Sequence, residues 1–211
     1  MERGPRLREE LAPAAPHGLV LVLHGGASRR GNPMVSPVQL SVLRMIPIAK
    51  RIARAGRGRL GVFRLLNSHR GWDTTHTPVH DARWALQALG ERYGADVPVC
   101  LIGHSLGGRA ALLTGPEPSV RSVIALNPWV YATDHADLAA RQVLVVHGTD
   151  DRVAPIERSA SVSRRLSRTA EVSFQTVEGG RHAMLRHGGE FERAAEAFTL
   201  STLLPEPTTQ R

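Results

Sequence analysis

The segment of the 211-residue chain that most suggests chemistry contains a serine with a glycine two positions away on each side. Residues 103–107 read GHSLG, a G-x-S-x-G pentapeptide that follows an apolar run at residues 97–102 and opens a helical pattern at residues 105–114. In so tight a turn between strand and helix, the serine backbone is strained, and side chains at the two glycine positions would collide. The hydroxyl of Ser105 is then held at a helix N-terminus, where the helix dipole favours developing negative charge. The pattern therefore predicts a nucleophilic serine.

A serine hydroxyl is a weak nucleophile, so it needs a base within hydrogen-bond reach and an acid that orients the base. An aspartate and a histidine follow two later predicted strands. Asp151 follows the apolar run at residues 142–147, and His182 follows the run at residues 171–177. The carboxyl ends of parallel strands share one edge of a sheet, and the serine turn lies there too. We therefore predict that His182 is the general base and that Asp151 is its orienting acid.

Each of these assignments has competitors in the sequence. Asp150 could take the acid role or could instead brace the turn, and Asp134 is a more distant candidate. His187 competes with His182, although two glycines precede only the latter. We expect His104 to point away from Ser105 and to serve packing, and we expect His24 to hold its glycine-rich loop in place. The spacing of the remaining histidines matches no strong ligand pattern, so no metal site is predicted.

These residues require a parallel sheet to bring them together. Continuous apolar runs indicate buried strands, and an alternating run at residues 171–177 indicates an edge strand. The predicted strands are residues 18–24, 60–66, 97–102, 122–126, 142–147 and 171–177. Helical patterns occur at residues 38–55, where Pro47 kinks or splits the helix, and at residues 78–93, 105–114, 156–166 and 190–203. This alternation predicts an α/β fold with a mostly parallel sheet of about six strands and helices on both faces.

The chain length suits one domain. We expect residues 1–16, which contain three prolines, to be a flexible arm, residues 17–204 to form the domain, and residues 205–211 to be a tail. Neither a secretory signal nor a membrane span is visible, so the chain is expected to be cytoplasmic. The single cysteine excludes an intrachain disulfide.

The net charge is +8, and nearly all of the positive charge is arginine. Because the arginines are scattered and are not interleaved with aromatic residues, we do not predict nucleic-acid binding. One asymmetry stands out, since no aspartate or glutamate occurs between Leu11 and Trp72. This stretch is interpreted either as a solvated basic face or as a region that meets an anionic substrate, partner or surface.

The order serine, aspartate, histidine, with G-x-S-x-G at a strand-to-helix turn, resembles the α/β-hydrolase fold family. Residues 147–155 (HGTDDRVAP) resemble that family's acid loop and favour Asp151 over its neighbour. Residues 179–182 (GGRH) resemble the histidine loop, and residues 24–26 (HGG) resemble the oxyanion loop. The resemblance covers residues 18–203, but the family's initial antiparallel pair of strands is missing from our predicted elements.

The resemblance implies a serine hydrolase that cleaves an ester, thioester or related acyl bond of a small molecule through an acyl-enzyme, without a cofactor. It implies an oxyanion hole from the N–H of Leu106 and an N–H of Gly26 or Ala27. The connection at residues 127–141 is too short for a cap domain, as in compact esterases and members similar to dienelactone hydrolase. The open alternatives are an acyltransferase or amidase with the same three residues, and a binding protein without turnover. Candidate pocket residues are Trp129, Trp72 and Arg29.

Overall fold

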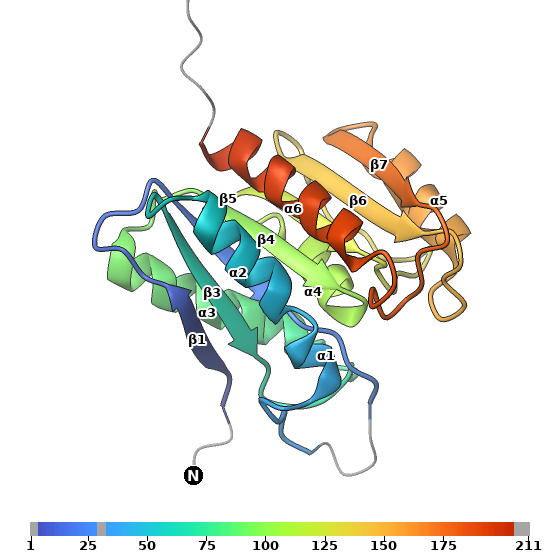
Figure 1. The fold of residues 1–211 in the computed structure, drawn as a ribbon, viewed down its shortest axis with the longest axis horizontal. Helices are drawn as coiled ribbons and strands as arrows, with labels where there is room; N and C mark the ends of the chain where they lie inside the picture. The colour runs from blue at the N-terminus through green and yellow to red at the C-terminus, as the bar shows by residue number, and fades with distance from the viewer. Residues whose placement is uncertain (1–3, 29–32, 205–211) are drawn as a thin grey trace, which may run out of the picture.

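The computed structural model describes residues 4–28 and 33–204. Its secondary-structure elements alternate between strands and helices along most of the chain (Figure 1). The strands are β1 (Arg6–Leu11), β2 (Gly18–Leu23), β3 (Leu60–Leu66), β4 (Val99–His104), β5 (Val120–Leu126), β6 (Gln142–Gly148) and β7 (Glu171–Val177). The helices are α1 (Leu40–Leu43), α2 (Ile46–Ala55), α3 (Thr77–Tyr93), α4 (Leu106–Thr114), α5 (Ile156–Leu166) and α6 (Gly188–Leu203).

The strands form one sheet in the order β1-β3-β2-β4-β5-β6-β7. All neighbouring pairs are parallel except β1 and β3. Every residue of β2 and β4 is buried, as the continuous apolar runs predicted. β7 is an edge strand with alternating burial. The predicted α/β class and the mostly parallel sheet are therefore confirmed.

Helices cover both faces of the sheet. Side chains of α3, α4 and α5 join one hydrophobic cluster with one face of the strands, and those of α2 and α6 join a second cluster on the other face. Figure 1 shows α2 and α6 side by side in front of the sheet. Pro47 occupies the first turn of α2, where a missing N–H costs nothing, so the predicted helix at residues 38–55 is split into α1 and α2.

The expectation of a flexible arm at residues 1–16 is wrong for β1, which makes the sheet seven strands wide rather than six. Pro5 and Pro13 flank the strand instead of interrupting it. β1 carries charges typical of an edge strand, and its Glu10 forms an ion pair with Arg64 of β3 at 2.5 Å. Leu7 also packs against the core. The charged residues of β1 do not give the apolar pattern expected of a strand, and pairing with the antiparallel β3 stabilises it. Residues 205–211 lie outside the described residues.

No helix or strand interrupts the connection between β5 and β6 at residues 127–141. The carboxyl edge of the sheet therefore carries no cap built from this segment. Among the helices described, none is both long and apolar enough to cross a membrane.

Removing residues 1–11 tests whether β1 contributes to stability. We expect the melting temperature to fall by at least about 4 °C, because the partly buried Leu7 and Leu11 lose contacts worth about 2 kcal/mol together. Thermal unfolding followed by circular dichroism measures the change. A variant without residues 1–4, which keeps β1, is the matched control. Equal melting temperatures for the two variants would show that β1 is a dispensable arm after all.

Candidate active site

Ser105 occupies a one-residue turn between β4 and α4. Its backbone angles are φ 56° and ψ −119°, in the region that residues other than glycine rarely adopt. Two backbone hydrogen bonds hold it there: the Ser105 N–H donates to the Leu126 carbonyl at 3.0 Å, and the Trp129 N–H donates to the Ser105 carbonyl at 3.0 Å. The strained serine is thus fixed by the end of β5 and the loop that follows.

The glycines of the G-x-S-x-G segment are required by backbone packing. A Cβ on Gly103 would overlap the carbonyl group of Gly107, and a Cβ on Gly107 would overlap the backbone at the end of β2. Gly25 has a similar constraint, because its Cβ would lie 2.9 Å from the His104 carbonyl oxygen. Only glycine lets the first turn of α4 approach β2 and β4 so closely.

The predicted nucleophile, base and acid lie together at the carboxyl edge of the sheet. His182 Nε2 is 2.9 Å from Ser105 Oγ, and His182 Nδ1 is 2.8 Å from Asp151 Oδ2. Since an ionised carboxylate only accepts hydrogen bonds, we assign the proton to Nδ1, which leaves Nε2 as an acceptor for the serine hydroxyl. Ser105 is 5% exposed, and the Asp151 side chain is fully buried.

Asp151 is held in its ionised form. Burial alone would raise the pKa of this carboxyl, but hydrogen bonds from His147, His182 and the N–H groups of Ala154 and Val153 outweigh burial and lower the pKa. The two backbone N–H groups donate to Oδ1 at 2.8 and 2.9 Å, and the buried His147 Nε2 is 3.4 Å from Oδ2. The carboxylate is therefore both anionic and fixed in orientation.

The competing residues lie elsewhere. Asp150 is exposed at the surface. Asp134 forms a bidentate ion pair with Arg109 at 2.6 and 2.8 Å, so both of its oxygens are engaged. His187 is exposed and lies 3.2 Å from Glu190 at the start of α6. None of the three joins the hydrogen-bonded chain that ends at Ser105.

Asn127 and His104 hold the backbone of the histidine loop, a role that the sequence analysis did not predict. Asn127 is fully buried at the end of β5, and its Nδ2 donates to the carbonyls of Arg181 and His182 at 3.1 and 3.3 Å. Its Oδ1 accepts the Gly148 N–H at 2.8 Å. His104 Nε2 donates to the His182 carbonyl at 2.7 Å. An asparagine directly after a buried strand was the available signal, since asparagine tolerates the left-handed conformation, φ 42°, found here.

Burial keeps His104 and His24 neutral. Desolvation is the largest influence on both, and it lowers the pKa of His104 to about 3 and that of His24 to about 4. His24 Nε2 accepts the Asn67 N–H at 3.2 Å, so its Nδ1 carries the proton and donates to the Gly25 carbonyl at 2.6 Å. His24 therefore fixes the loop that contains Gly26 and Ala27, as its position after β2 predicted.

A cavity of about 510 Å³ opens beside Ser105 and His182. The predicted oxyanion residues Gly26, Ala27 and Leu106 line it. Leu106 is the first residue of α4, so its N–H has no acceptor within the helix. The Leu106 N–H is thus a backbone donor beside the serine.

The candidate pocket residues have different positions. Trp129 lines the cavity. Trp72 does not, because its ring stacks on the Arg109 guanidinium, 4.1 Å from the ring centroid, while its backbone binds the Ser28 hydroxyl. Arg29 lies outside the described residues. In the part of the chain that the structure covers, no group of three or more histidine, cysteine, aspartate or glutamate side chains is arranged to hold a metal ion.

Comparisons with known proteins identify the fold. No family model matches the chain, and no curated protein sequence matches it. Several solved structures, by contrast, match this chain in fold. Est1E from Butyrivibrio proteoclasticus, solved with ferulic acid bound, has a TM-score of 0.70 at 15% identity, and the match covers 94% of this chain and 95% of Est1E. XC6422 from Xanthomonas campestris, described as an α/β serine hydrolase without a lid, has a TM-score of 0.70 at 16% identity over 96% and 91% of the two chains.

This chain has the α/β-hydrolase fold. A serine hydrolase homologue from Coxiella burnetii is similar in the same way, with a TM-score of 0.68 at 17% identity over 92% of this chain and 90% of the homologue. The fold predicted from the serine turn and the three loops is confirmed, and the described residues form no cap domain, as predicted. At such identities, the α/β-hydrolase fold is what these likenesses establish.

Replacing Gly103 by alanine tests the packing of the serine turn in this α/β-hydrolase fold. We expect a loss of several kcal/mol in the free energy of unfolding or a failure to fold, because the new methyl group overlaps backbone that cannot move aside. Gly90→Ala in α3 is the matched control. A Cβ at position 90 meets only Ala95 at 3.8 Å, so this change should stabilise the helix by up to about 1 kcal/mol. Urea unfolding compares the variants, and equal effects would refute the packing argument.

The buried His104 should make the protein less stable in acid. The folded chain has a pKa of about 3 at this residue against an ordinary 6.5, so between these values the unfolded chain binds more protons. The free energy of unfolding therefore falls as the pH drops, and His104 alone accounts for about 2 kcal/mol between pH 8 and pH 5.

His104→Gln keeps an N–H donor for the His182 carbonyl but does not titrate. We expect this variant to show a shallower loss of unfolding free energy over the same pH range, measured by urea unfolding at each pH. His187→Gln, which changes an exposed histidine, is the control and should retain the slope of the parent protein. An unaltered slope in His104→Gln would mean that His104 is not the group responsible.

Proposed function

We propose that the protein is a serine hydrolase that cleaves an ester, thioester or related acyl bond through a covalent acyl-enzyme. The observation that carries the proposal is the continuous set of hydrogen bonds from Asp151 through His182 to Ser105, at 2.8 and 2.9 Å, at the wall of an open cavity. A serine, a histidine and a carboxylate in this geometry are the parts that acyl transfer to serine requires.

In the first step, Ser105 Oγ attacks the acyl carbonyl carbon while its proton passes to His182 Nε2. The imidazole becomes an imidazolium, and the Asp151 carboxylate stabilises it through Nδ1–H without accepting the proton. The lowered pKa of Asp151 suits this role, because the carboxyl stays ionised wherever the imidazole is neutral. His182 then returns the proton to the leaving alcohol or thiol as the bond to the acyl carbon breaks.

The negative charge that develops on the carbonyl oxygen needs donors that are already in position. The N–H of Leu106 and an N–H of Gly26 or Ala27 are the proposed pair, since these residues line the cavity beside the serine. Losing one such donor typically costs on the order of 10²–10³ in kcat. The hydrogen bonds of His24 hold the Gly26 side of this pair, and the helical first turn of α4 holds the other.

In the second step, water attacks the acyl-enzyme. His182 takes a proton from the water, and Ser105 leaves with that proton as the free acid is released. Because residues 4–28 and 33–204 build no cap over the site, water reaches it directly. A likeness in fold to solved structures named esterase PE8 and arylesterase supports an ester substrate over other acyl compounds. The cavity volume of about 510 Å³ matches sites for small molecules.

A fluorophosphonate probe tests whether Ser105 is an activated nucleophile. We expect the parent protein to be labelled at Ser105, as shown by mass spectrometry of the labelled peptide, and p-nitrophenyl esters to be hydrolysed. Ser105→Ala should show neither labelling nor turnover, because it lacks the attacking oxygen. An unlabelled parent protein, or esterase activity that survives in Ser105→Ala, would contradict the proposal.

Two neighbouring aspartates provide a matched test of the acid. Asp151→Asn should lower kcat by on the order of 10³–10⁴, since an amide favours the wrong imidazole tautomer and cannot stabilise the imidazolium. Asp150→Asn removes the same charge from an exposed position and should leave kcat/KM as in the parent. Steady-state kinetics with p-nitrophenyl butyrate separates the two. If the two variants lose activity equally, Asp151 is not the orienting acid.

A further inference from the structure

Two arginines line the cavity that contains Ser105 and His182. Arg44 ends α1, and Arg70 lies in the loop after β3, where its N–H donates to the Pro33 carbonyl at 3.1 Å. Both side chains are partly buried. They come from segments that are separated in sequence, yet they share the cavity with the proposed nucleophile.

Neither guanidinium has a carboxylate partner among the residues that the structure describes. Other arginines that are buried or partly buried have an acceptor: Arg51, Arg64 and Arg109 form ion pairs with carboxylates. Arg6, Arg141 and Arg165 instead donate to backbone carbonyls. No residue that lines the cavity is acidic. The Asp151 carboxylate, which is outside the lining, already accepts three hydrogen bonds and lies 3.4 Å from His147 Nε2. Both arginines lie in the stretch between Leu11 and Trp72, which contains no acidic residue. The cavity that they line therefore carries positive charge that no lining carboxylate balances.

Some polar atoms of the cavity residues have no hydrogen-bond partner among the described residues, as is also true of Arg6 Nε outside the cavity. Four such atoms are buried without a hydrogen-bond partner in the described part of the chain: Nε of Arg44, Nε of Arg70, Nε1 of Trp129 and Oε1 of Gln39. Three of the four belong to N–H donors. Buried donors without acceptors are costly and uncommon, so each needs an explanation. Burial also lowers the pKa of Arg44, which is the effect of a cation removed from water without a counter-charge.

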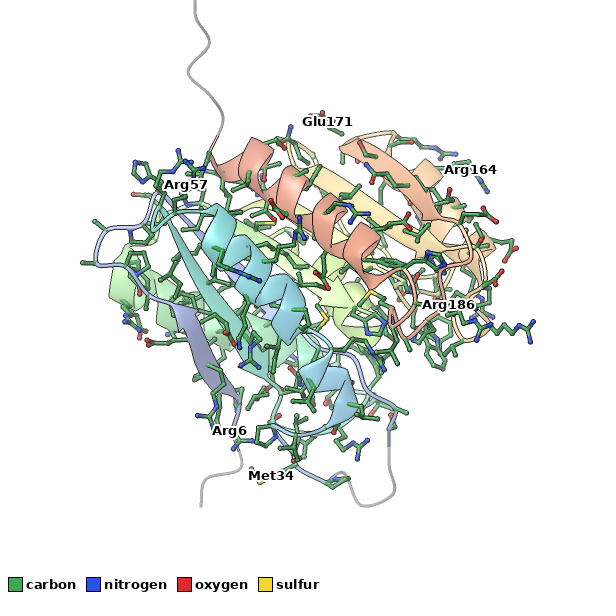
Figure 2. The ribbon with its side chains drawn as sticks, in the orientation of Figure 1. Arg6, Met34, Arg57, Arg164, Glu171 and Arg186 are labelled. Carbon is green, nitrogen blue, oxygen red and sulfur yellow. The ribbon has the colours of Figure 1, made fainter. Side chains whose placement is uncertain are left out.

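Most of the basic surface has no such arrangement. Figure 2 shows Arg57, Arg164 and Arg186 at the periphery of the molecule, where their side chains project away from the ribbon. All three are exposed and therefore solvated. Between Leu11 and Trp72, where the sequence left two interpretations open, a solvated face accounts for Arg57 but not for Arg44 and Arg70.

We propose that the substrate is an ester that carries a carboxylate or phosphate group, which Arg44 and Arg70 bind beside the reacting carbonyl. The planar guanidinium forms paired hydrogen bonds with either anion. Apolar side chains of Leu106, Trp129 and Val153 line the same cavity and suit the hydrocarbon part of such a molecule. The inference rests on the proposed function and names its substrate class.

Ester pairs of equal length test the preference for an anion. In the first pair the charge is on the acyl chain, and p-nitrophenyl hydrogen adipate is compared with p-nitrophenyl hexanoate. In the second pair it is on the leaving group, and 4-hexanoyloxybenzoate is compared with phenyl hexanoate. We expect kcat/KM to be about tenfold or more higher for the charged member of at least one pair, since a hydrogen bond to a charged group contributes that much to affinity. Equal or lower values for both charged esters overturn the proposal.

Variants then show whether the two arginines cause the preference. In Arg44→Gln and in Arg70→Gln, the ratio of kcat/KM between the charged and neutral esters should fall about tenfold, while Arg44→Lys should retain part of it. Arg164→Gln changes the net charge equally at an exposed position and should keep the parent ratio. Ratios that stay unchanged in both cavity variants, or that fall equally in Arg164→Gln, overturn the assignment. Because a ratio is compared, a general loss of folded protein does not mimic the effect.

Inhibition distinguishes the two anions. Phenyl phosphate and phenylacetate are tested as competitive inhibitors of p-nitrophenyl hexanoate hydrolysis at constant ionic strength. The stronger inhibitor identifies the anion, and inhibition by neither overturns the proposal. Failure of the proposed function gives a different result, since no ester is then turned over and Ser105 is not labelled.

Discussion

The close approach of backbone at the carboxyl edge of β4 is the constraint on which the rest of the site depends. The first turn of α4 lies against β2 and β4 at a distance that only glycine permits at positions 103 and 107. This contact holds Ser105 in its strained conformation and fixes where the Leu106 N–H lies. A side chain at either glycine would move the proposed nucleophile and one oxyanion donor together.

A second set of contacts fixes the proposed base and acid relative to that turn. Asn127 connects the end of β5 to the histidine loop and to Gly148, and His104 binds the carbonyl of His182. These groups are buried and fully or nearly fully excluded from water, so their hydrogen bonds are strong and expensive to break. The same burial keeps His104 neutral, which links the geometry of the site to the stability of the protein in acid.

Charge is distributed in opposite ways on the two sides of Ser105. On the side of His182, the buried Asp151 carboxylate accepts three hydrogen bonds, lies near His147, and has a lowered pKa. On the cavity side, Arg44 and Arg70 have no described carboxylate beside them. The first arrangement suits the stabilisation of an imidazolium, and the second suits an anion supplied from outside. An enzyme for charged esters would need both.

The sequence by itself determined the α/β fold, most strands and helices, and the three side chains that meet at one edge of the sheet. It could do so because buried parallel strands are continuously apolar and because Gly103 and Gly107 serve a local backbone constraint. Only the tertiary structure decided that residues 6–11 form β1, that Trp72 stacks on Arg109 outside the cavity, and that Asn127 holds the histidine loop. Only the tertiary structure distinguishes Arg44 and Arg70, which line the cavity, from the arginines that are exposed to solvent. Each of these depends on contacts between residues far apart in the chain, and spacing along a sequence carries no information about such partners.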